Sequence, residues 1–512
     1  MKVKTYGSIY IGTYEVSLRI YEVKNREKKL KVIDDLRKPV SVAHDIYREG
    51  KISDETINTI IDALSDMKLA LEEYRIDFYQ AYVGYAVGKA SNFLLLADQI
   101  RLRCGLFVKL MTNSEHRFYN YEALAALPSF QKMIEKSALL ADIGGSSIQL
   151  TLFREGKLLT TQHILFGASA VRENLMSLSQ KADAREQVYE MIVKETDTFF
   201  NMYLKDRKPE YLILLNDNFS NVLSLFDVRA DAFNKAVEKK KTVDFLKHIG
   251  SDNFFRNTFE KFGVEDPDEM VLPFLLLYRA MIAQTDCKMI SNPGISIHDG
   301  ITLQMLYNTG TIKSSHDFDG DVISAAYFTA ERFGSYLAHI RMMDKISAAI
   351  YDAVANKSGL TKRMRLLTRV IAILHDCGKY ISLSSAPESS YTIIMSSEFL
   401  GITHAERKLI ALVVRYNHEH EVSYDDLKDE LSEEDYVVFL KLLAILRICN
   451  ALDSSHKQKF KDMAIRLRND TLFITVASEQ PLNLEKEYFR EKGQFFEDVF
   501  GIRPQIRDKK EF

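Results

Sequence analysis

The apolar positions of residues 1–311 change repeatedly between a period of two and a period near 3.6, which predicts strands interleaved with helices. Ser53 is the expected N-cap of the first long amphipathic helix. Strands are predicted at 78–87, 106–111, 138–142, 147–154 and 211–215, and helices at 94–104, 112–136, 168–205 and 231–262. This interleaving favours an α/β sheet architecture.

After about residue 312 the pattern becomes helical and stays so to residue 456, which predicts a separate all-α domain. A strand at 469–477 and a last helix at 484–499 follow. We therefore expect four parts, at residues 1–125, 126–311, 312–460 and 461–512.

Composition and charge narrow the class of protein only slightly. The net charge is −3 over 512 residues, and this nearly neutral total gives no support to nucleic-acid or anionic-membrane binding. The four widely spaced cysteines form no CxxC pair, which argues against a disulfide framework or thiolate zinc site and favours a reducing compartment. We expect a cytoplasmic protein, because there is no signal-peptide pattern and the longest apolar stretch, 270–283, is short and contains Arg279.

A turn that occurs twice is the most informative feature. Asp142–Leu150 and Tyr10–Leu18 align residue by residue, with an Ile and a Gly after the first position and an alternating strand after the turn. Glycine lets a backbone approach a phosphate and point its N–H groups at it, and Asp142 could hold Mg²⁺ through water. A plain glycine-rich hairpin is the alternative. The first copy has Tyr10 where the second has an aspartate, and it has one glycine where the second has two.

Ordered motifs across nearly the whole chain resemble those of the exopolyphosphatase / guanosine pentaphosphate phosphatase (Ppx/GppA) family, within the actin-like ATPase superfamily. Asp142–Gln149 matches the family's D-[IL]-G-G-[GA]-S-x-E, and Met111–Arg117 matches its I-S-G-x-E-E-A. Four more segments match in order: Val83–Asn92, Phe166–Arg172, Val271–Met281 and His298–Gly300. The resemblance implies two actin-like (ribonuclease H-like) α/β domains, an all-α HD-like domain and a small C-terminal α/β piece. It also implies a homodimer that hydrolyses terminal phosphoanhydride bonds of polyphosphate or a guanosine polyphosphate.

The resemblance also assigns site residues. Glu115 stands at the position of the family's catalytic glutamate, which would orient water, although a solvated glutamate at a helix start is the alternative. Asp142 and Gln149 would lie at Mg²⁺. The residues expected to bind phosphate are Gly12, Thr13, Gly144, Gly145, Ser146, Ser147 and Arg172.

Departures from the family pattern fall on this same cleft. The first-hairpin aspartate is Tyr10, the second-hairpin glutamate is Gln149, and the arginine of A-T-S-A-x-R is Gly88. A second glycine-rich loop is replaced by the segment 216–220. These losses predict weak or absent catalysis, or a changed substrate, and leave open a non-catalytic sensor or scaffold.

The helical region holds a second candidate site. His339, His375, Asp376 and Asp453 follow the ligand order of metal-dependent HD phosphohydrolases, and imidazole with carboxylate suits a hydrolytic divalent metal. The alternative is that these histidines and aspartates are buried in a helical core and form hydrogen bonds within it. His418–Glu421 is expected to be a solvated helix end or loop. The basic runs 239–241 and 507–510 could meet a polyanion or be solvated faces.

Overall fold

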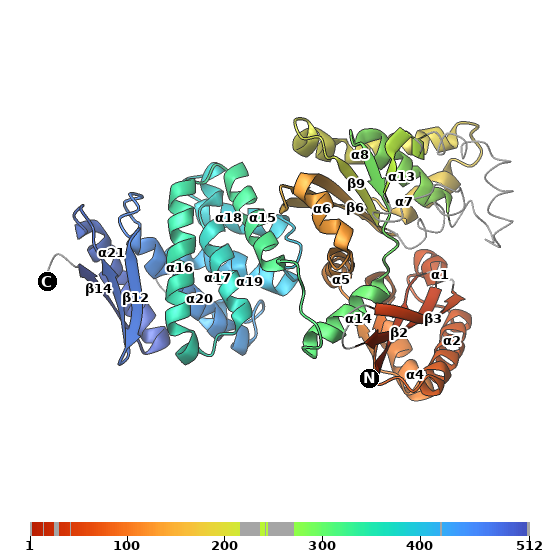
Figure 1. Cartoon of the computed structure of the whole chain (residues 1–512), viewed down its shortest axis with the longest axis horizontal. Coiled ribbons are helices and arrows are strands. Elements are labelled where there is room, and N and C mark those ends of the chain that lie inside the picture. Colours follow the sequence, from red (N-terminus) through yellow and green to blue (C-terminus); the bar gives the residue numbers. More distant parts are fainter. Residues whose placement is uncertain are drawn as a thin grey trace. The chain divides into compact units, whose positions relative to one another are not determined.

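A computed structural model describes residues 3–13, 15–24, 30–40, 42–215, 236–240, 242–243, 271–419 and 422–508. The chain forms two compact units (Figure 1). Unit 1 comprises Met1–Lys157 and Gln162–Asp317, and unit 2 comprises Leu158–Thr161 and Phe318–Phe512. The substituted loop 216–220 and most of the helix expected at 231–262 lie outside the described residues. Within the described part, residues 236–238 form a strand that pairs with a neighbouring strand, so the helix prediction is wrong there. The four-part division of the chain stays a prediction.

The first sheet of unit 1 has the strand order β3-β2-β1-β4-β5. β1, β2 and β3 pair antiparallel, while β4 and β5 continue parallel to β1. Its strands are β1 (Val3–Ile11), β2 (Glu15–Lys24), β3 (Leu30–Pro39), β4 (Phe78–Val83) and β5 (Val108–Leu110). Its helices are α1 (Val42–Glu49), α2 (Asp54–Glu73), α3 (Tyr85–Gly88) and α4 (Phe93–Cys104).

The second sheet has the order β10-β11-β9-β6-β7-β8. Read from its other edge, as β8-β7-β6-β9-β11, it repeats the order of the first sheet, with β10 added at the end. β6 and β7 form the antiparallel hairpin, while β9 and β11 run parallel to β6. Its strands are β6 (Ser137–Ile143), β7 (Ile148–Arg154), β8 (Lys157–Ile164), β9 (Tyr211–Leu215), β10 (Ala236–Glu238) and β11 (Met289–Ser291). The remaining helices of unit 1 are α5 (Asn113–Ala125), α6 (Pro128–Lys136), α7 (Ala168–Ser177), α8 (Ala184–Phe199), η1 (Phe200–Leu204), α13 (Leu272–Gln284) and α14 (Ile297–Asn308). Two sheets with one shared strand order confirm the prediction of two actin-like α/β domains.

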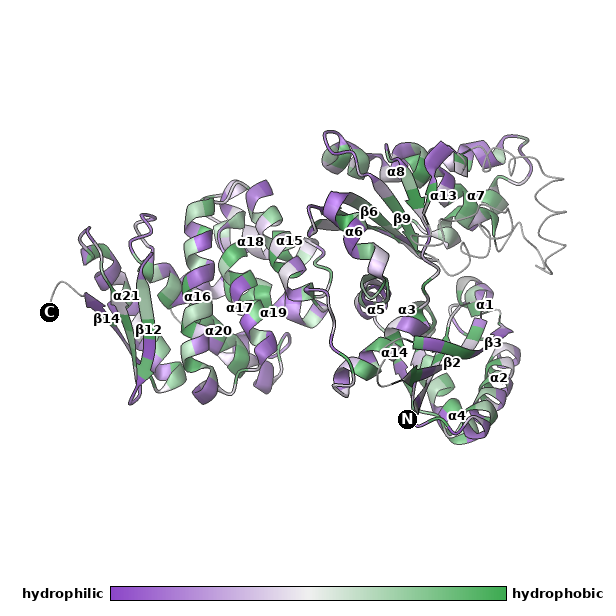
Figure 2. Ribbon diagram, viewed as in Figure 1, coloured by the Kyte–Doolittle hydropathy of each residue, from purple (hydrophilic) through white to green (hydrophobic). Residues whose placement is uncertain are grey.

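Local sequence rules explain most boundaries. Ser53 caps α2 as predicted, because its side-chain oxygen accepts a hydrogen bond from the Thr56 amide at 3.2 Å. The strand predicted over 78–87 is too long, since it stops at Val83 and α3 follows. The helix predicted over 112–136 is two helices, because Pro128 has no amide hydrogen and begins a new one at α6. Figure 2 shows hydrophobic residues along β9 and α13, where the second core lies.

Unit 2 is helical up to a small C-terminal sheet, as predicted. Its helices are α15 (Phe318–Arg332), α16 (Leu337–Ser358), α17 (Lys362–Leu374), η2 (Cys377–Tyr380), α18 (Ala386–Ser396), α19 (His404–Arg415), η3 (Tyr416–His418), η4 (Tyr424–Asp426) and α20 (Glu433–Leu452). The sheet β12-β13-β14 follows, with β12 (Met463–Arg468), β13 (Thr471–Val476), β14 (Arg503–Asp508) and the helix α21 (Asn483–Phe500). The four cysteines are buried and free. Among the described residues, no helix is both long and apolar enough to cross a membrane.

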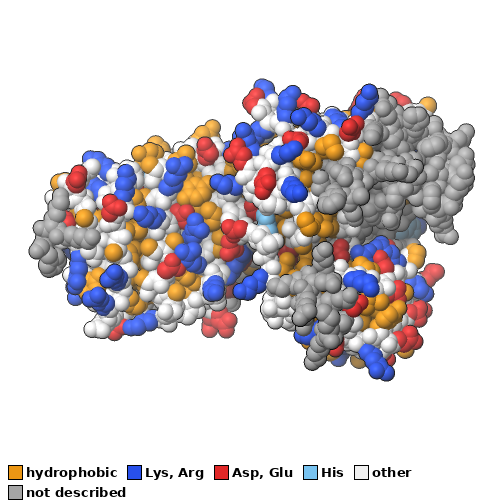
Figure 3. Space-filling view, in the orientation of Figure 1, with side chains coloured by type: hydrophobic (Ala, Val, Ile, Leu, Met, Phe, Trp, Pro, Cys, Tyr) orange, Lys and Arg blue, Asp and Glu red, His pale blue; other side chains and the backbone are white. Residues whose placement is uncertain are grey.

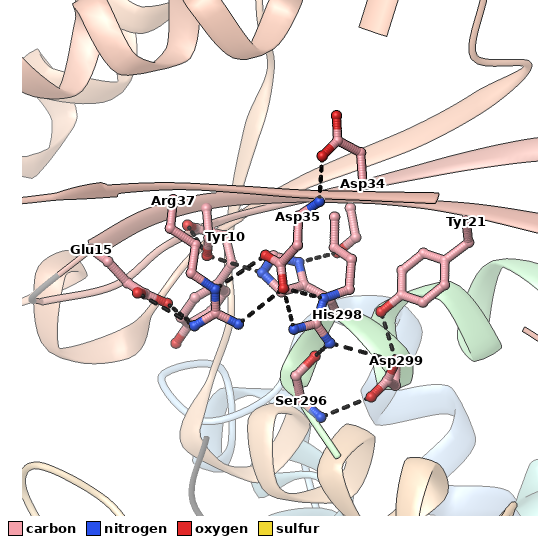
Figure 4. Close-up of polar contacts among 12 residues, drawn as sticks. Tyr10, Glu15, Tyr21, Asp34, Asp35, Arg37, Ser296, His298 and Asp299 are labelled. Carbon is pink, nitrogen blue, oxygen red and sulfur yellow. Dashed lines mark hydrogen bonds and ion pairs between the residues drawn. The ribbon is translucent and has the colours of Figure 1, made fainter. Parts of the chain in front are cut away.

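The helix α14 returns to the first sheet and is anchored there by a polar network (Figure 4). His298 lies between the hydroxyls of Ser8 and Ser17, 2.9 Å from each, and is almost fully buried. Arg19 donates to Asp35 and to Ser296. Burial, together with the nearby positive charges of Arg19 and Arg37, lowers the pKa of His298 to about 3.

This depressed pKa predicts an acid-sensitive fold. Unfolded His298 binds a proton below pH about 6.5, whereas the folded ring stays neutral down to pH about 3. Stability is therefore complete above pH 6.5 and falls as the pH drops, by about 2 kcal/mol between pH 7 and pH 5. Urea unfolding at both pH values should show a smaller pH effect in His298→Asn than in the wild type. The control is His44→Asn, which changes an exposed histidine. An equal change in the free energy of unfolding between pH 7 and pH 5 in all three proteins would contradict the prediction.

Candidate functional site

The two repeated turns line one cavity of about 510 Å³ in unit 1. Thr13 of the first turn lines this cavity, and so do Gly145 and Ser146 of the second turn. The other lining residues come from α1, α3 and α7: Ala43, His44, Ile46, Arg48, Ala86, Ser169, Arg172, Glu173 and Met176. Four residues predicted to bind phosphate, namely Thr13, Gly145, Ser146 and Arg172, therefore meet at this cavity.

The second turn is held against the start of α7. The Gly144 amide donates to the Ser147 carbonyl at 2.9 Å and closes the hairpin. The first two amides of α7, at Ala168 and Ser169, donate to the carbonyls of Gly144 and Gly145. These bonds fix the turn with Gly145 and Ser146 at the cavity surface. Gly144 and Ser147 thus shape the turn, whereas Gly145 and Ser146 face the cavity.

The first turn is closed in the same way, because the Gly12 amide donates to the Glu15 carbonyl at 2.8 Å. Tyr10, at the end of β1, fills space that an aspartate would leave open. Its hydroxyl lies over Gly84, so close that a Cβ on Gly84 would overlap it. Its ring also lies 5.8 Å from the ring of His116, measured between centroids.

An arginine occupies the place beside Gln149. Arg117 donates from Nη1 to Gln149 Oε1 at 2.7 Å and from Nη2 to Ser147 Oγ at 2.6 Å. Gln149 is buried and pairs across the hairpin with Asp142. The oxygen expected to face Mg²⁺ therefore accepts from a guanidinium, and one carboxylate, Asp142, remains in this pair. This donor set does not fit a Mg²⁺ ion held between Asp142 and Gln149.

Arg117 stands where the resembling motif ends in alanine, and His116 where it has a second glutamate. Burial lowers the pKa of His116; Arg117 lowers it too, while Asp142 opposes both. A neutral imidazole and a guanidinium thus replace an acidic and a small residue. Sequence reasoning did not single out Arg117, although its mismatch with the motif was visible.

Glu115 has a structural partner. Its Oε2 accepts from the amide and the hydroxyl of Thr112, each at 2.8 Å, and the Glu115 amide donates back to Thr112 Oγ1 at 3.2 Å. This capping box closes the first turn of α5. Glu115 is not among the residues lining the cavity. The hydrogen bonds of Glu115 suit a residue that caps a helix, and its catalytic role stays a prediction.

The second candidate site comes together in the helical domain. Ligand atoms of His339, His375 and Asp376 all lie within 4.8 Å of one another, and all three residues are buried. His339 Nδ1 lies 2.8 Å from Asp453 Oδ2, and His375 Nδ1 lies 2.9 Å from the Ala372 carbonyl. Because both partners are acceptors, each Nδ1 carries the hydrogen.

The two Nε2 atoms then face each other with their lone pairs, 3.3 Å apart. A carboxylate oxygen of Asp376 lies 3.5 Å from Nε2 of His375, which adds a third electron-rich group. Burial lowers the pKa of His375 to about 4. This convergence of acceptors fits a bound cation, with Asp453 orienting His339 from behind.

Sequence reasoning missed two neighbours of this cluster. His456 stacks on His339 with ring centroids 3.9 Å apart, and Lys379 Nζ lies 2.7 Å from Asp376 Oδ2. Burial opposes ionisation of Asp376, but His375 and Lys379 lower its pKa to about 2. His456 follows Asp453 by three residues, a spacing that could have drawn attention to it.

Comparisons with known proteins find similarity to parts of this chain. Residues 327–492 match the family model Ppx/GppA phosphatase, domain III. A search of curated proteins finds no significant match. The structure is similar to an Aquifex aeolicus Ppx/GppA family member, with 17% identity, 60% of this chain and 99% of that chain covered, and a TM-score of 0.49. It is also similar to an exopolyphosphatase from Cytophaga hutchinsonii, with 16% identity, 60% and 98% covered, and a TM-score of 0.48.

Proposed function

We propose that this chain, a homologue of the Ppx/GppA phosphatases, binds polyphosphate or a guanosine polyphosphate in the cavity of unit 1 and hydrolyses it weakly or not at all. The observation that carries the proposal is that both hairpin turns line one cavity while Arg117 stands beside Gln149. The resemblance also implies a homodimer, and the cysteine spacing and the lack of a signal-peptide pattern favour a cytoplasmic location; both are further predictions.

The cavity has the chemistry of a phosphate-chain site. Arg48 and Arg172 supply positive charge, and Thr13 and Ser146 supply hydroxyl groups. Gly145 leaves the turn without a side chain, so a phosphate oxygen can approach its backbone. One acidic side chain, Glu173, also lines the cavity.

The chemistry for fast hydrolysis is less complete. Phosphoryl transfer needs cations that neutralise the developing charge and a carboxylate that orients water. Arg117 already donates to Gln149 and Ser147, and Glu115 is held in its capping box. Binding therefore survives the substitutions better than turnover does.

Removal of Arg172 tests the binding site. Arg172→Ala should weaken binding of long-chain polyphosphate or pppGpp about tenfold or more, because a charge-assisted hydrogen bond to phosphate is lost. Isothermal titration calorimetry measures this directly. Arg154→Ala, which removes a half-exposed arginine beside Glu155, should leave the affinity unchanged. Equal affinities for the wild type and Arg172→Ala would place the phosphate chain elsewhere.

The convergence of His339, His375 and Asp376 favours a second candidate function, a metal-dependent hydrolase in the helical domain. These residues would hold a divalent metal, which supplies Lewis-acid chemistry and an activated water when bound. Lys379 could then attract an anionic substrate to the same place. The HD-like character of this domain belongs to the same proposal.

Metal analysis of the purified protein tests this second function. We expect about one transition metal per chain, lost in His375→Ala. Asp453→Ala should lower the metal affinity about 10- to 100-fold, because Asp453 orients His339 without being a ligand. His404→Ala, at the exposed start of α19, is the control. A wild type without metal, after growth and purification with added Mn²⁺ or Zn²⁺, would exclude this function.

A further inference from the structure

The open face of the C-terminal sheet carries arginines on two of its three strands. The antiparallel register places Arg466 opposite Phe473 and Arg468 opposite Thr471. The parallel register places Arg503 beside Thr471 and Arg507 beside Thr475. Because side chains alternate along a strand, these residues share one face. The open face is therefore formed by Ala464, Arg466, Arg468, Thr471, Phe473, Thr475, Arg503, Gln505 and Arg507.

The other face of this sheet is the one that packs. Leu472, Ile474 and Val476 point there and are buried. Pro504 lies against Gly493 of α21, which shows that this helix covers that side. On the open face, Arg466, Arg468 and Arg503 are exposed. Figure 3 shows Lys and Arg side chains gathered over the C-terminal strands.

The charge on the open face is unbalanced. None of its nine positions is acidic, and within the part of the chain that the structure describes none of the four arginines forms an ion pair with a carboxylate. Asp470, at the turn between β12 and β13, is engaged by Lys357 at 2.6 Å. The near-neutral charge of the whole chain therefore conceals a local surface that is complementary to a polyanion.

An aromatic side chain lies in the middle of this charge. Phe473 is on the central strand, flanked by Arg466 of β12 and Gln505 of β14. The Arg507 guanidinium lies over its ring, 3.4 Å from the centroid. Both an aromatic ring and a guanidinium plane are surfaces on which a nucleobase stacks. Polyphosphate would use the arginines alone and has no group to stack.

We propose that this face, formed by Arg466, Arg468, Phe473, Arg503 and Arg507, binds single-stranded nucleic acid. The arginines contact backbone phosphates, and a base stacks on the Phe473–Arg507 pair. Side chains two residues apart on one strand lie about 7 Å apart and neighbouring strands about 4.8 Å apart, so the face accommodates about two or three nucleotides. Duplexes stack their bases internally and cannot use the aromatic group.

Fluorescence anisotropy with a labelled ten-nucleotide oligouridine tests the proposal on the full chain. The wild type should bind, with an affinity that falls as salt rises. Arg466→Ser/Arg468→Ser should bind at least tenfold more weakly, with the slope of log affinity against log salt reduced by about 1.4, since two phosphate contacts are lost. Arg490→Ser, on the exposed side of α21, should match the wild type.

Phe473→Leu separates stacking from charge while keeping an apolar side chain at this position. It should weaken binding about fivefold or more with the salt slope unchanged, and circular dichroism should show an intact fold. Absence of oligouridine binding, or an unchanged affinity in Arg466→Ser/Arg468→Ser, would overturn the proposal. Equal binding by Phe473→Leu, together with equally strong competition from a duplex or from polyphosphate, would instead show a general polyanion surface and would also overturn it.

Discussion

Replacing Gly167 with alanine is expected to destabilise the protein by about 3 kcal/mol, at the upper end of the cost of overpacking. A Cβ at this position would lie 2.5 Å from the Gly145 carbonyl oxygen and 2.6 Å from the Ser146 carbonyl carbon. These atoms belong to the backbone of the second turn, so no side-chain rotation relieves the overlap. The turn would have to leave α7, and phosphate binding should weaken with it. Urea unfolding and calorimetry measure the two effects.

Gly145→Ala is the matched control for this substitution. Its nearest neighbour would be Ser169 Oγ at 3.6 Å, an ordinary contact, so its stability should lie within about 0.5 kcal/mol of the wild type. If Gly167→Ala is as stable as Gly145→Ala, the packing of the turn on α7 is not as described.

The second large effect is expected from placing beside Asp142 the residues that the resembling motifs have at positions 117 and 149. Arg117→Ala/Gln149→Glu removes the guanidinium and places a second carboxylate directly opposite Asp142 across the hairpin. Opposite side chains on paired strands lie about 5 Å apart at Cβ, close enough to share one Mg²⁺. We expect the variant to bind Mg²⁺ and to release phosphate from polyphosphate about tenfold faster than the wild type in Mg²⁺.

Arg117→Ala alone is the control, because it removes the cation without adding a carboxylate. It should gain little Mg²⁺ affinity and little activity. If the double variant behaves like this control in titrations with Mg²⁺, Arg117 and Gln149 do not determine the metal response. If the wild type already releases phosphate at the rate of the double variant, the cleft is an active phosphatase despite Arg117.

Local patterns in the sequence predicted many of the elements and the meeting of the two turns, although the helix predicted over 168–205 is divided into α7, α8 and η1. The residue-by-residue match of Tyr10–Leu18 with Asp142–Leu150 corresponds to two hairpins in sheets of one strand order, and parts of both turns line the cavity. The capping role of Glu115 was also readable, because Thr112 precedes it by three residues. The same glutamate matches the catalytic position of the resembling motif, which predicts catalysis instead.

Contacts between distant segments could not be read from the sequence in the same way. Arg117 and Gln149 are far apart in the chain, and only the fold brings the first turns of α5 within hydrogen-bond distance of the β6–β7 hairpin. The convergence of His339 with His375 depends in the same way on the packing of α16 on α17. The arginines of the open face of the C-terminal sheet come together through the register of β12, β13 and β14. The net charge of the chain carries no information about that register.

The central claim is that the cleft of unit 1 binds a phosphate chain with its own cations and turns rather than through Mg²⁺. The most direct measurement is the affinity of the wild type for long-chain polyphosphate and for pppGpp, by titration calorimetry in EDTA and in excess Mg²⁺. We predict binding in both conditions with affinities that agree within about threefold, equivalent to about 0.7 kcal/mol. Binding that appears only with Mg²⁺, or no binding of either compound, would contradict the account.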